Sequence, residues 1–218
     1  MSLINTYLPH HLRREHNVNV VSPVLSGGEL INTLVHTPKP KIEMPKKEEI
    51  PLMNEIEKIF DSIPNYPTKN PAKDNTRKNV IQDGKMGEAI SAMVLGKVRS
   101  YSDKELVQST ISRKGRFELL ESKLRELVKL HNPRFRYTSI QVNKAVETNW
   151  HWDRGNVGLS YCIAFGDFTG GGVVVRTKDG EKTYNNKRRW LYYDGHNIEH
   201  KSAPSRGTRY AVIFFTKS

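Results

Sequence analysis

The sequence predicts an α+β protein in which short antiparallel strands form a sandwich or jelly roll and a helical layer supports them. The first observation is a series of short apolar runs after Arg136, with no helix-length pattern between them. The second is a set of turn signals, most of them containing glycine, that separates these runs. The third is an amphipathic segment at 117–130, which precedes the runs and predicts the supporting helix.

The strands are expected where β-branched and aromatic residues gather between turn signals. These runs lie at 137–143, 159–165, 172–176, 189–193 and 209–215, with a weaker alternation at 149–153. The turn signals lie at 153–156, 166–172, 178–180, 194–195 and 205–207. Short strands joined by such turns predict antiparallel pairing, so the class is α+β with a jelly-roll core.

One helix is predicted from its apolar stripe. The stripe has helical spacing and consists of Phe117, Leu120, Leu124, Leu127 and Val128. Asn132 and Pro133 end the helix, because proline cannot continue it. A leucine stripe of this kind faces a core, so the helix at 117–130 is assigned a buttressing role and no chemistry.

The first part of the chain has a different composition. Residues 1–80 hold nine of the eleven prolines, which predicts a Pro-rich, partly extended N-terminal extension. Within it, 37–51 is expected to be an extended linker or arm, and 52–63 has helical spacing. Residues 81–218 are expected to form the jelly-roll domain, and its segment 86–98 fits either a helix or a buried strand.

Positive charge is concentrated in the later part of the chain. The protein has 35 Lys+Arg and 23 Asp+Glu, a net charge of +12. Residues 81–218 contain 24 of the basic and 14 of the acidic residues, so ten of the twelve excess charges lie there. A basic folded domain favours a polyanionic partner, most simply nucleic acid. The alternative is a lysine-rich protein without such a partner.

Cysteine content and hydropathy exclude several classes. Cys162 is the single cysteine, which excludes an intramolecular disulfide framework and a multi-cysteine zinc site. No run approaches the roughly 18 apolar residues of a membrane-spanning helix, and the start lacks the apolar run of a secretory signal. The expectation is an intracellular monomer with no membrane contact, nuclear if the source is eukaryotic.

Three residues form a candidate metal site: His151, Asp153 and the later His200. Side chains two apart on a strand share a face, so His151 and Asp153 can point the same way. Two histidines and one carboxylate form the facial triad of non-haem Fe(II) oxygenases, which leaves positions open for a 2-oxo acid and dioxygen. His196 is the rival to His200, but its place after Asp194–Gly195 indicates a turn.

The chain also offers an anchor for a dicarboxylate. Arg209 opens the last predicted strand, and a buried guanidinium there suits the far carboxylate of 2-oxoglutarate. Arg206 is the rival anchor, but it lies in the 205–207 turn and is expected to face solvent or phosphate. Asn143 shares a strand face with Ser139 and Gln141, a polar stripe that lines the active cavity or lies on an outer face.

Several stretches together resemble the Fe(II)/2-oxoglutarate dioxygenases of the TET/JBP type, which act on nucleic acid. The matching stretches are 137–143, Asn149–Asp153, Asn156–Tyr161, Ile163–Gly171, Trp190–Gly195, His200 and Gly207–Val212. The resemblance covers roughly 135–216 and implies a double-stranded β-helix core. It implies that His151, Asp153 and His200 hold iron and that Arg209 holds 2-oxoglutarate, while Asn143 and Arg206 remain further candidates for the 2-oxoglutarate site. The family often has serine where this chain has Ala211.

The resemblance also implies a reaction. Fe(II), 2-oxoglutarate and dioxygen would hydroxylate the 5-methyl group of 5-methylcytosine or thymine in DNA, with release of succinate and carbon dioxide. The reacting base would be flipped out of the duplex. The alternatives are a prolyl-type protein hydroxylase, an AlkB-like nucleic-acid demethylase and a DNA-binding module without catalysis.

Basic clusters are the candidate contacts to DNA phosphates. They comprise Arg113, Lys114, Arg116, Lys187, Arg188 and Arg189, and Arg134 and Arg136 form a further pair. Arg154 and Asn156 follow Asp153 and are predicted either to reach 2-oxoglutarate or the substrate or to shape the turn. Trp150, Trp152 and Trp190 are expected to pack in the core, and Cys162 is expected to be a small buried hydrophobe.

Overall fold

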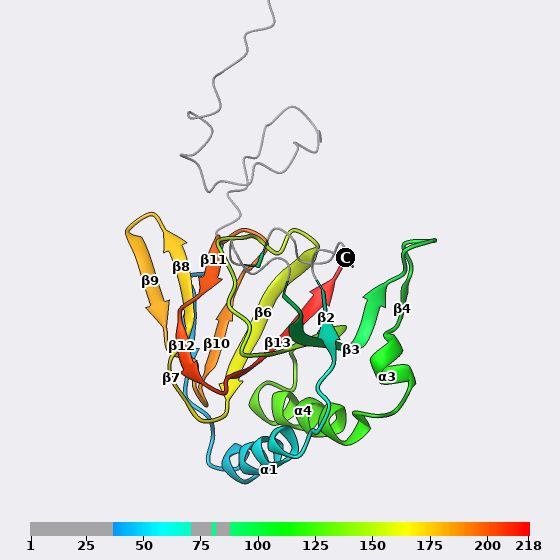
Figure 1. Ribbon diagram of the computed structural model, residues 1–218. Helices are drawn as coiled ribbons and strands as arrows, with labels where there is room; N and C mark the ends of the chain where they lie inside the picture. Colours follow the sequence, from blue (N-terminus) through cyan, green and yellow to red (C-terminus); the bar gives the residue numbers. More distant parts are fainter. Residues whose placement is uncertain (1–36, 71–79, 82–87) are drawn as a thin grey trace, which may run out of the picture. The chain divides into compact units, whose positions relative to one another are not determined.

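One large and two small antiparallel sheets build the fold in the described part of the computed structural model, residues 37–70, 80–81 and 88–218 (Figure 1). The large sheet has the order β1-β10-β6-β13-β5-β3-β2, and β4 pairs with β3. Its strands are β1 Lys41–Glu43, β10 Trp190–Tyr193, β6 Asn156–Phe165, β13 Tyr210–Lys217, β5 Ser139–Lys144, β3 Ile90–Arg99, β2 Thr68–Lys69 and β4 Leu106–Gln108. The small sheets comprise β11 His200–Ser202, β8 Val173–Thr177 and β9 Gly180–Tyr184, and β12 Ser205–Gly207 with β7 Phe168–Gly170.

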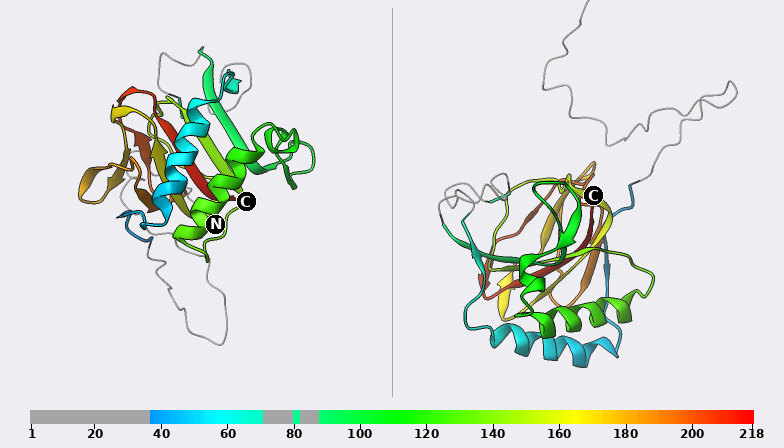
Figure 2. Two further views of the ribbon diagram at one scale, coloured as in Figure 1. Left: turned by 90° about the horizontal axis from the view of Figure 1, so that it is seen from below. Right: turned by 90° about the vertical axis from the view of Figure 1, so that its right-hand side faces the viewer.

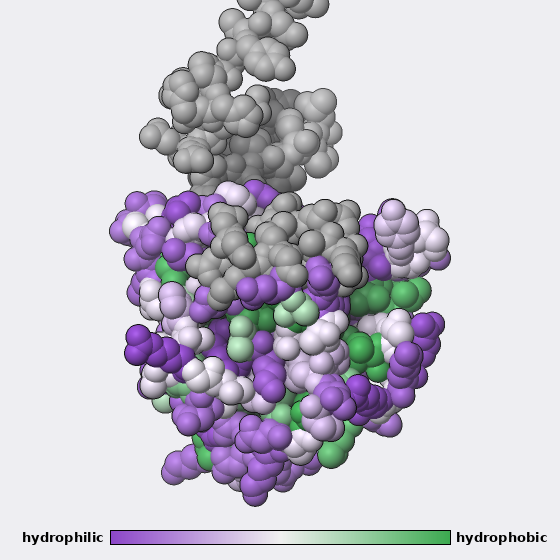
Figure 3. All heavy atoms as spheres, viewed as in Figure 1, coloured by the Kyte–Doolittle hydropathy of each residue, from purple (hydrophilic) through white to green (hydrophobic). Residues whose placement is uncertain are grey.

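Two helices, α1 Glu49–Asp61 and α4 Glu118–His131, cover one face of the large sheet side by side (Figure 2). A shorter helix, α3 Thr110–Arg113, leads towards α4. The outer surface over the helical end is largely hydrophilic (Figure 3), so the apolar stripes of both helices point inward. No helix in the described ranges is long and apolar enough to cross a bilayer.

Strand alternation divides the large sheet into a helix side and a cavity side. On β13, the buried Tyr210, Val212 and Phe214 belong to the core that packs against the helices. Between them, Ala211 and Ile213 turn to the opposite side. Successive side chains on a strand face opposite ways, so the residues of β13 that alternate with the core residues are the ones that enter the cavity. A second, smaller core contains Cys162 of β6, Val173 and Val175 of β8, Leu191 and Tyr193 of β10, and Ile198.

The predicted class, α+β with a jelly-roll core and a supporting helix, is confirmed by this arrangement. The helix expected at 117–130 is α4, displaced by one residue. The ambiguous segment 86–98 is largely strand β3, since Met93 and Leu95 pack against the helices while Val94 faces the cavity. The turn signals at 166–172 and 205–207 contain short strands of their own, because Ser205 pairs with Gly170 across β12 and β7.

The structure groups part of the predicted extension with the sheet domain. Lys39–Ser218 form one compact unit, whereas the sequence places a boundary at residue 80. The reason is burial: Met53, Ile56 and Phe60 of α1 are each at most 1% exposed in the main core. The segment 37–51, expected to be an extended linker or arm, is extended at β1 but also contains the start of α1. The rest of the predicted extension, residues 1–36 and 71–79, lies outside the described residues.

Candidate functional site

The three candidate metal ligands are brought together by backbone pairing. His151 and His200 form an isolated antiparallel bridge, with N–H to carbonyl distances of 2.9 and 3.0 Å in the two directions. Two residues on, the backbone N–H of Asp153 donates to the carbonyl of Gly195 at 2.8 Å. These bonds align the segment after β5 with the segment that leads into β11. Asp153 and His200 are therefore adjacent in the fold although they are far apart in the sequence.

The ligand atoms of this triad lie within 4.8 Å of one another. Nε2 of His151 is 3.9 Å from Oδ1 of Asp153, and Nε2 of His200 is 3.7 Å from Oδ2 of the same carboxylate. The two imidazole ring centroids are 4.3 Å apart. His151 and His200 are buried, and the Asp153 side chain is 30% exposed. The two histidines are therefore enclosed by the protein, and the cluster is open to solvent at Asp153.

The second nitrogen of each imidazole is already used. Nδ1 of His151 lies 2.7 Å from the carbonyl oxygen of Asn149, and Nδ1 of His200 lies 2.9 Å from that of Ile198. A carbonyl only accepts, so each Nδ1 carries the proton and each Nε2 presents a lone pair. A ligating histidine is held in this way, and two imidazoles with one carboxylate suit Fe(II). The donor set fits a metal ion.

Close packing around the triad explains the Asp194–Gly195 turn of the predicted motif. A Cβ on Gly195 would lie 3.2 Å from Oδ2 of Asp153 and 3.3 Å from both the His200 and Tyr193 rings. The Tyr193 ring meets His200 edge-on, with centroids 4.9 Å apart. Gly195 therefore leaves room for the carboxylate between the turn and the ring. The sequence alone does not predict a role for Tyr193, because its contact with His200 depends on the fold.

A cavity of about 370 Å³ opens beside the triad. On β5, Ile140 and Val142 point to the helices, so Ser139, Gln141 and Asn143 point into this cavity. The Nε2 group of Gln141 donates to Oδ1 of Asn143 at 2.8 Å, which fixes the two amides relative to each other. The predicted polar stripe thus lines the cavity.

Arg209 enters the same cavity from the start of β13. Its side chain is 4% exposed, and its Nε has no hydrogen-bond partner among the described residues. Burial lowers the pKa of this guanidinium, while the nearby Cys162 and Tyr193 act in the opposite direction. A buried cation with an unused donor needs an anion, and a carboxylate matches the planar fork. Arg206, the rival anchor, is exposed on β12 and does not line the cavity.

The candidate DNA contacts divide between the cavity and the outer surface. Asn156 is buried and lines the cavity. The remaining candidates lie elsewhere and are Arg113, Lys114, Arg116, Arg154, Lys187, Arg188 and Arg189. Arg188 forms an ion pair with Glu57 and donates to Asn54 at 2.7 Å, which ties it to α1. The structure thus brings the metal candidates together with Arg209 and Asn143 at one cavity, and it leaves Arg206 and these basic residues outside the cavity lining.

Two of the three tryptophans do not pack as expected. Trp190 is fully buried in the main core, in agreement with the prediction. Trp152, in contrast, is 41% exposed, and among the described residues its segment, 149–153, pairs with β11 through one bridge, between His151 and His200. Trp150 lies between two cations, with Arg176 at 4.2 Å and Lys201 at 4.4 Å from its ring.

Cys162 is buried, as expected, on the cavity side of β6. Burial raises the pKa of its thiol to about 11, although Arg209 and a hydrogen bond from Asn186 act in the opposite direction. The thiolate is the reactive form of cysteine, so this side chain is an inert part of the cavity wall.

The fold is shared with solved oxygenase structures, whereas neither the protein-family models nor the curated proteins gave a match. NgTET1 in complex with 5mC DNA has a TM-score of 0.50 at 17% identity, over 82% of this chain and 72% of that chain. A 2OG-Fe(II) oxygenase-family oxidoreductase from Burkholderia pseudomallei has a TM-score of 0.48 at 14% identity, over 78% and 79%. A Pseudomonas putida prolyl-4-hydroxylase has a TM-score of 0.48 at 8% identity, over 83% and 92%. At these identities the likeness shows the fold alone.

Proposed function

We propose that this protein is an Fe(II)- and 2-oxoglutarate-dependent dioxygenase that hydroxylates the 5-methyl group of a pyrimidine in DNA. The observation that carries the proposal is the cavity shared by the His151, Asp153 and His200 cluster and the buried Arg209. The cluster fits a ferrous ion, and the guanidinium fits the far carboxylate of the 2-oxo acid. Bound Fe(II) and 2-oxoglutarate supply the activation of dioxygen, which oxidises the 2-oxo acid to succinate and carbon dioxide and hydroxylates the methyl group.

The protein's own residues hold and isolate this chemistry. The carbonyls of Asn149 and Ile198 keep the two imidazoles in the tautomer that presents Nε2. Arg209 has no carboxylate partner among the described residues, so its charge is available to orient the 2-oxo acid. The apolar residues of the second core close the cavity behind the triad. Water is thereby excluded from that side of the site.

The DNA substrate is supported by charge and by the resemblance in sequence. Residues 81–218 carry ten of the twelve excess positive charges, which suits a polyanion. The stretches from 137–143 to Gly207–Val212 resemble the TET/JBP type. NgTET1, which has the same fold, was solved in complex with 5mC DNA. A flipped pyrimidine would reach the triad through the open side of the cavity.

Mass spectrometry of candidate substrates tests the proposal. The full chain is incubated with Fe(II), 2-oxoglutarate and DNA that contains either 5-methylcytosine or only unmethylated cytosine and thymine. The expected product carries one added oxygen on the methyl group and depends on both cofactors. The Asp153→Asn variant is the matched control, because it keeps the shape of the side chain but weakens the metal ligand.

Parallel substrates decide between the alternatives. Proline-containing peptides test a prolyl-type hydroxylase, and N-methylated DNA tests an AlkB-like demethylase. Oxidised peptide with unchanged DNA would replace the proposal with a protein hydroxylase. DNA binding with no turnover of any substrate would instead favour a binding module.

A further inference from the structure

The cavity that holds the triad is lined by an excess of cations. Besides Arg209, its basic lining residues are Lys69, Lys97, Arg99, Lys201 and Lys217. Asp153 is the only carboxylate that lines it among the described residues. A cavity of this composition attracts anions and repels cations. None of these five residues belongs to the basic clusters recognised in the sequence.

The excess remains after the proposed cofactors are counted. The two charges of Fe(II) and the charge of Arg209 balance the Asp153 carboxylate and the two carboxylates of 2-oxoglutarate. The charges of Lys97, Arg99, Lys201 and Lys217 are therefore not matched by the charges of the cofactors. Among the described residues, Lys97, Arg99, Lys201 and Lys217 form no ion pair with a side-chain carboxylate. No side-chain carboxylate among the described residues thus neutralises these four charges, which suits an anionic substrate.

These cations stand on both walls of the cavity. Lys97 and Arg99 lie at the end of β3, and Lys217 lies at the end of β13, both in the large sheet. Lys201 lies on β11 of the small sheet, next to the candidate ligand His200. A single small anion would occupy one of these positions. A chain with several regularly spaced charges can occupy both walls.

Lys217 lies beside the turn that follows the metal-site carboxylate. Its Nζ lies against Gly155, two residues after Asp153, where an added Cβ would collide with the ammonium group. Burial lowers the pKa of Lys217, the charge of Asp153 acts in the opposite direction, and Arg99 lowers it further. Nε of Arg99 donates to the backbone oxygen of Ser218 at 2.7 Å, which holds the guanidinium beside the end of β13. An anion placed between Lys217 and Arg99 would relieve the repulsion between these two cations.

We propose that Lys97, Arg99 and Lys217 on one wall, and Lys201 on the other, bind backbone phosphates on either side of the reacting nucleotide. The inference rests on the proposed function and deepens it. It assigns the contacts with the nucleic-acid substrate to these four lining cations, which we call the cavity mouth. Phosphates placed on two walls hold the strand while one base lies between them. The surface clusters at 113–116 and 187–189 then contribute only long-range attraction.

Salt-dependent DNA binding tests this assignment without metal or cofactor. Binding of a fluorescent 5-methylcytosine oligonucleotide to the full chain is followed by anisotropy over a series of salt concentrations. The cavity variant carries Lys97→Gln, Arg99→Gln and Lys217→Gln. The matched control carries Lys47→Gln, Lys58→Gln and Lys129→Gln, which removes the same charge from exposed positions at the helical end. Thermal unfolding confirms that both variants are folded.

The cavity variant is expected to bind DNA at least about 10-fold more weakly than the control variant. The slope of log K against log salt should fall by about 2, since each lost phosphate contact removes roughly 0.7 to 0.9. Equal affinities and slopes for the two variants would overturn the inference. Competition by polyglutamate as strong as that by DNA would also overturn it, because the site would then recognise charge and not a phosphate backbone.

The outcomes separate this inference from the proposed function. If the wild-type protein hydroxylates 5-methylcytosine in DNA while both variants bind DNA equally, the proposed function stands and the phosphate sites are wrong. If the cavity variant alone loses DNA binding while no DNA is hydroxylated, the phosphate sites stand and the proposed reaction is wrong.

Discussion

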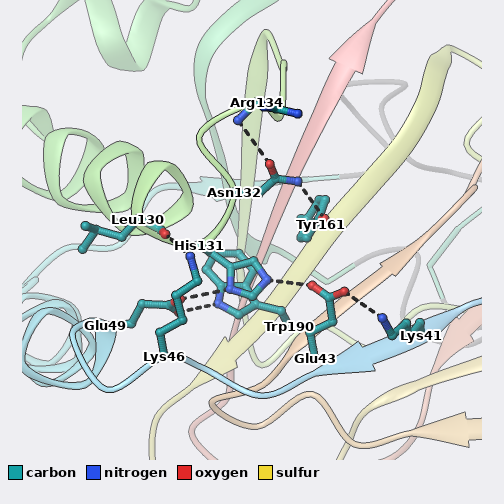
Figure 4. A network of polar contacts seen from close by, with 10 residues as sticks. All are labelled: Lys41, Glu43, Lys46, Glu49, Leu130, His131, Asn132, Arg134, Tyr161 and Trp190. Carbon is teal, nitrogen blue, oxygen red and sulfur yellow. Dashed lines mark hydrogen bonds and ion pairs between the residues drawn. The ribbon is translucent and has the colours of Figure 1, made fainter.

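Two buried histidine clusters on opposite sides of the large sheet use their ring nitrogens differently. On the helix side, His131 at the end of α4 has both nitrogens on carboxylates (Figure 4). Nδ1 is 3.0 Å from Oε1 of Glu49, and Nε2 is 3.0 Å from Oε2 of Glu43. On the cavity side, His151 and His200 each use one nitrogen on a backbone carbonyl and turn the other towards a shared carboxylate.

The cluster on the helix side is a closed structural network. Glu49 is fully buried and accepts a hydrogen bond of 2.7 Å from Nε1 of Trp190. The His131 ring stacks on Trp190 with centroids 4.7 Å apart. Both ring nitrogens of His131 are thus engaged by carboxylates. It joins α4 to β1 and α1 and has no ring nitrogen left for a metal.

Residue types alone therefore do not identify a metal site. Both clusters combine buried histidine with carboxylate. What differs is the partner of each nitrogen, because a carbonyl fixes the tautomer and leaves a lone pair, whereas two carboxylates occupy the whole ring. Variants that affect one cluster and not the other test this distinction.

The largest effect is expected for the cavity cluster. His151→Ala should abolish 2-oxoglutarate turnover and lower iron affinity by more than about 100-fold, because loss of a ligand exceeds loss of an outer hydrogen bond. Iron affinity is measured by competition with a chelator. His131→Gln is the control and should keep normal iron affinity. Normal iron binding by His151→Ala would show that the triad is misassigned.

The next largest effect is expected on the free energy of unfolding, when His131 of the helix-side cluster is replaced. His131→Ala should lower the free energy of unfolding by about 3–5 kcal/mol, because it removes the ring that partners the buried Glu49 carboxylate. Urea unfolding followed by circular dichroism measures the change. The double variant His131→Ala/Glu49→Gln should recover part of the loss, since the uncompensated charge is gone. If His131→Ala unfolds no more easily than His151→Ala, the network is not structural.

The sequence predicted the cavity cluster but not the helix-side cluster, for a physical reason. His151 and Asp153 have strand spacing, and His200 follows in a recognisable order. His131, Glu43 and Glu49 come from three separate elements and share no spacing, so only the tertiary packing brings them together. The class of fold was predictable from apolar runs and turns.

The cations of the cavity mouth were missed because of their positions along the chain. Lys97 and Arg99 lie in or next to a segment whose pattern fitted either a helix or a strand. The last strand is predicted to end at residue 215, before Lys217. In the structure this strand, β13, extends to Lys217. Without the ends and the pairing of β3 and β13, these residues could not be assigned to the cavity. Isolated lysines also give a weaker signal than basic clusters.

Arg209 and Arg206 provide a second matched pair. Arg209→Ala should raise the 2-oxoglutarate concentration needed for half-maximal turnover by more than about 30-fold, as for loss of one partner of a buried charge pair. Arg206→Ala should change it by less than about 3-fold, because that side chain is exposed and outside the cavity. Direct calorimetric binding of 2-oxoglutarate provides a readout apart from turnover. A larger effect of Arg206→Ala than of Arg209→Ala would show that the residue that anchors 2-oxoglutarate is on β12.

The smallest effect concerns the edge of the helix-side network. Burial alone would raise the pKa of Glu43, but hydrogen bonds from Lys41 and His131 outweigh it and leave the pKa below its usual 4.5. A carboxylate with a lowered folded pKa stabilises the protein above pH 4.5, and this contribution is lost as pH falls through the folded value.

Glu43→Gln should therefore destabilise the protein by at most about 1 kcal/mol near neutral pH, since the carboxylate is partly exposed. The difference from the wild type should shrink towards zero as the pH falls below 4.5. Urea unfolding of both proteins over a pH series measures it. A difference that stays constant with pH would mean that Glu43 acts through packing and not through its charge, which would restrict the electrostatic network to the buried Glu49 and His131 pair.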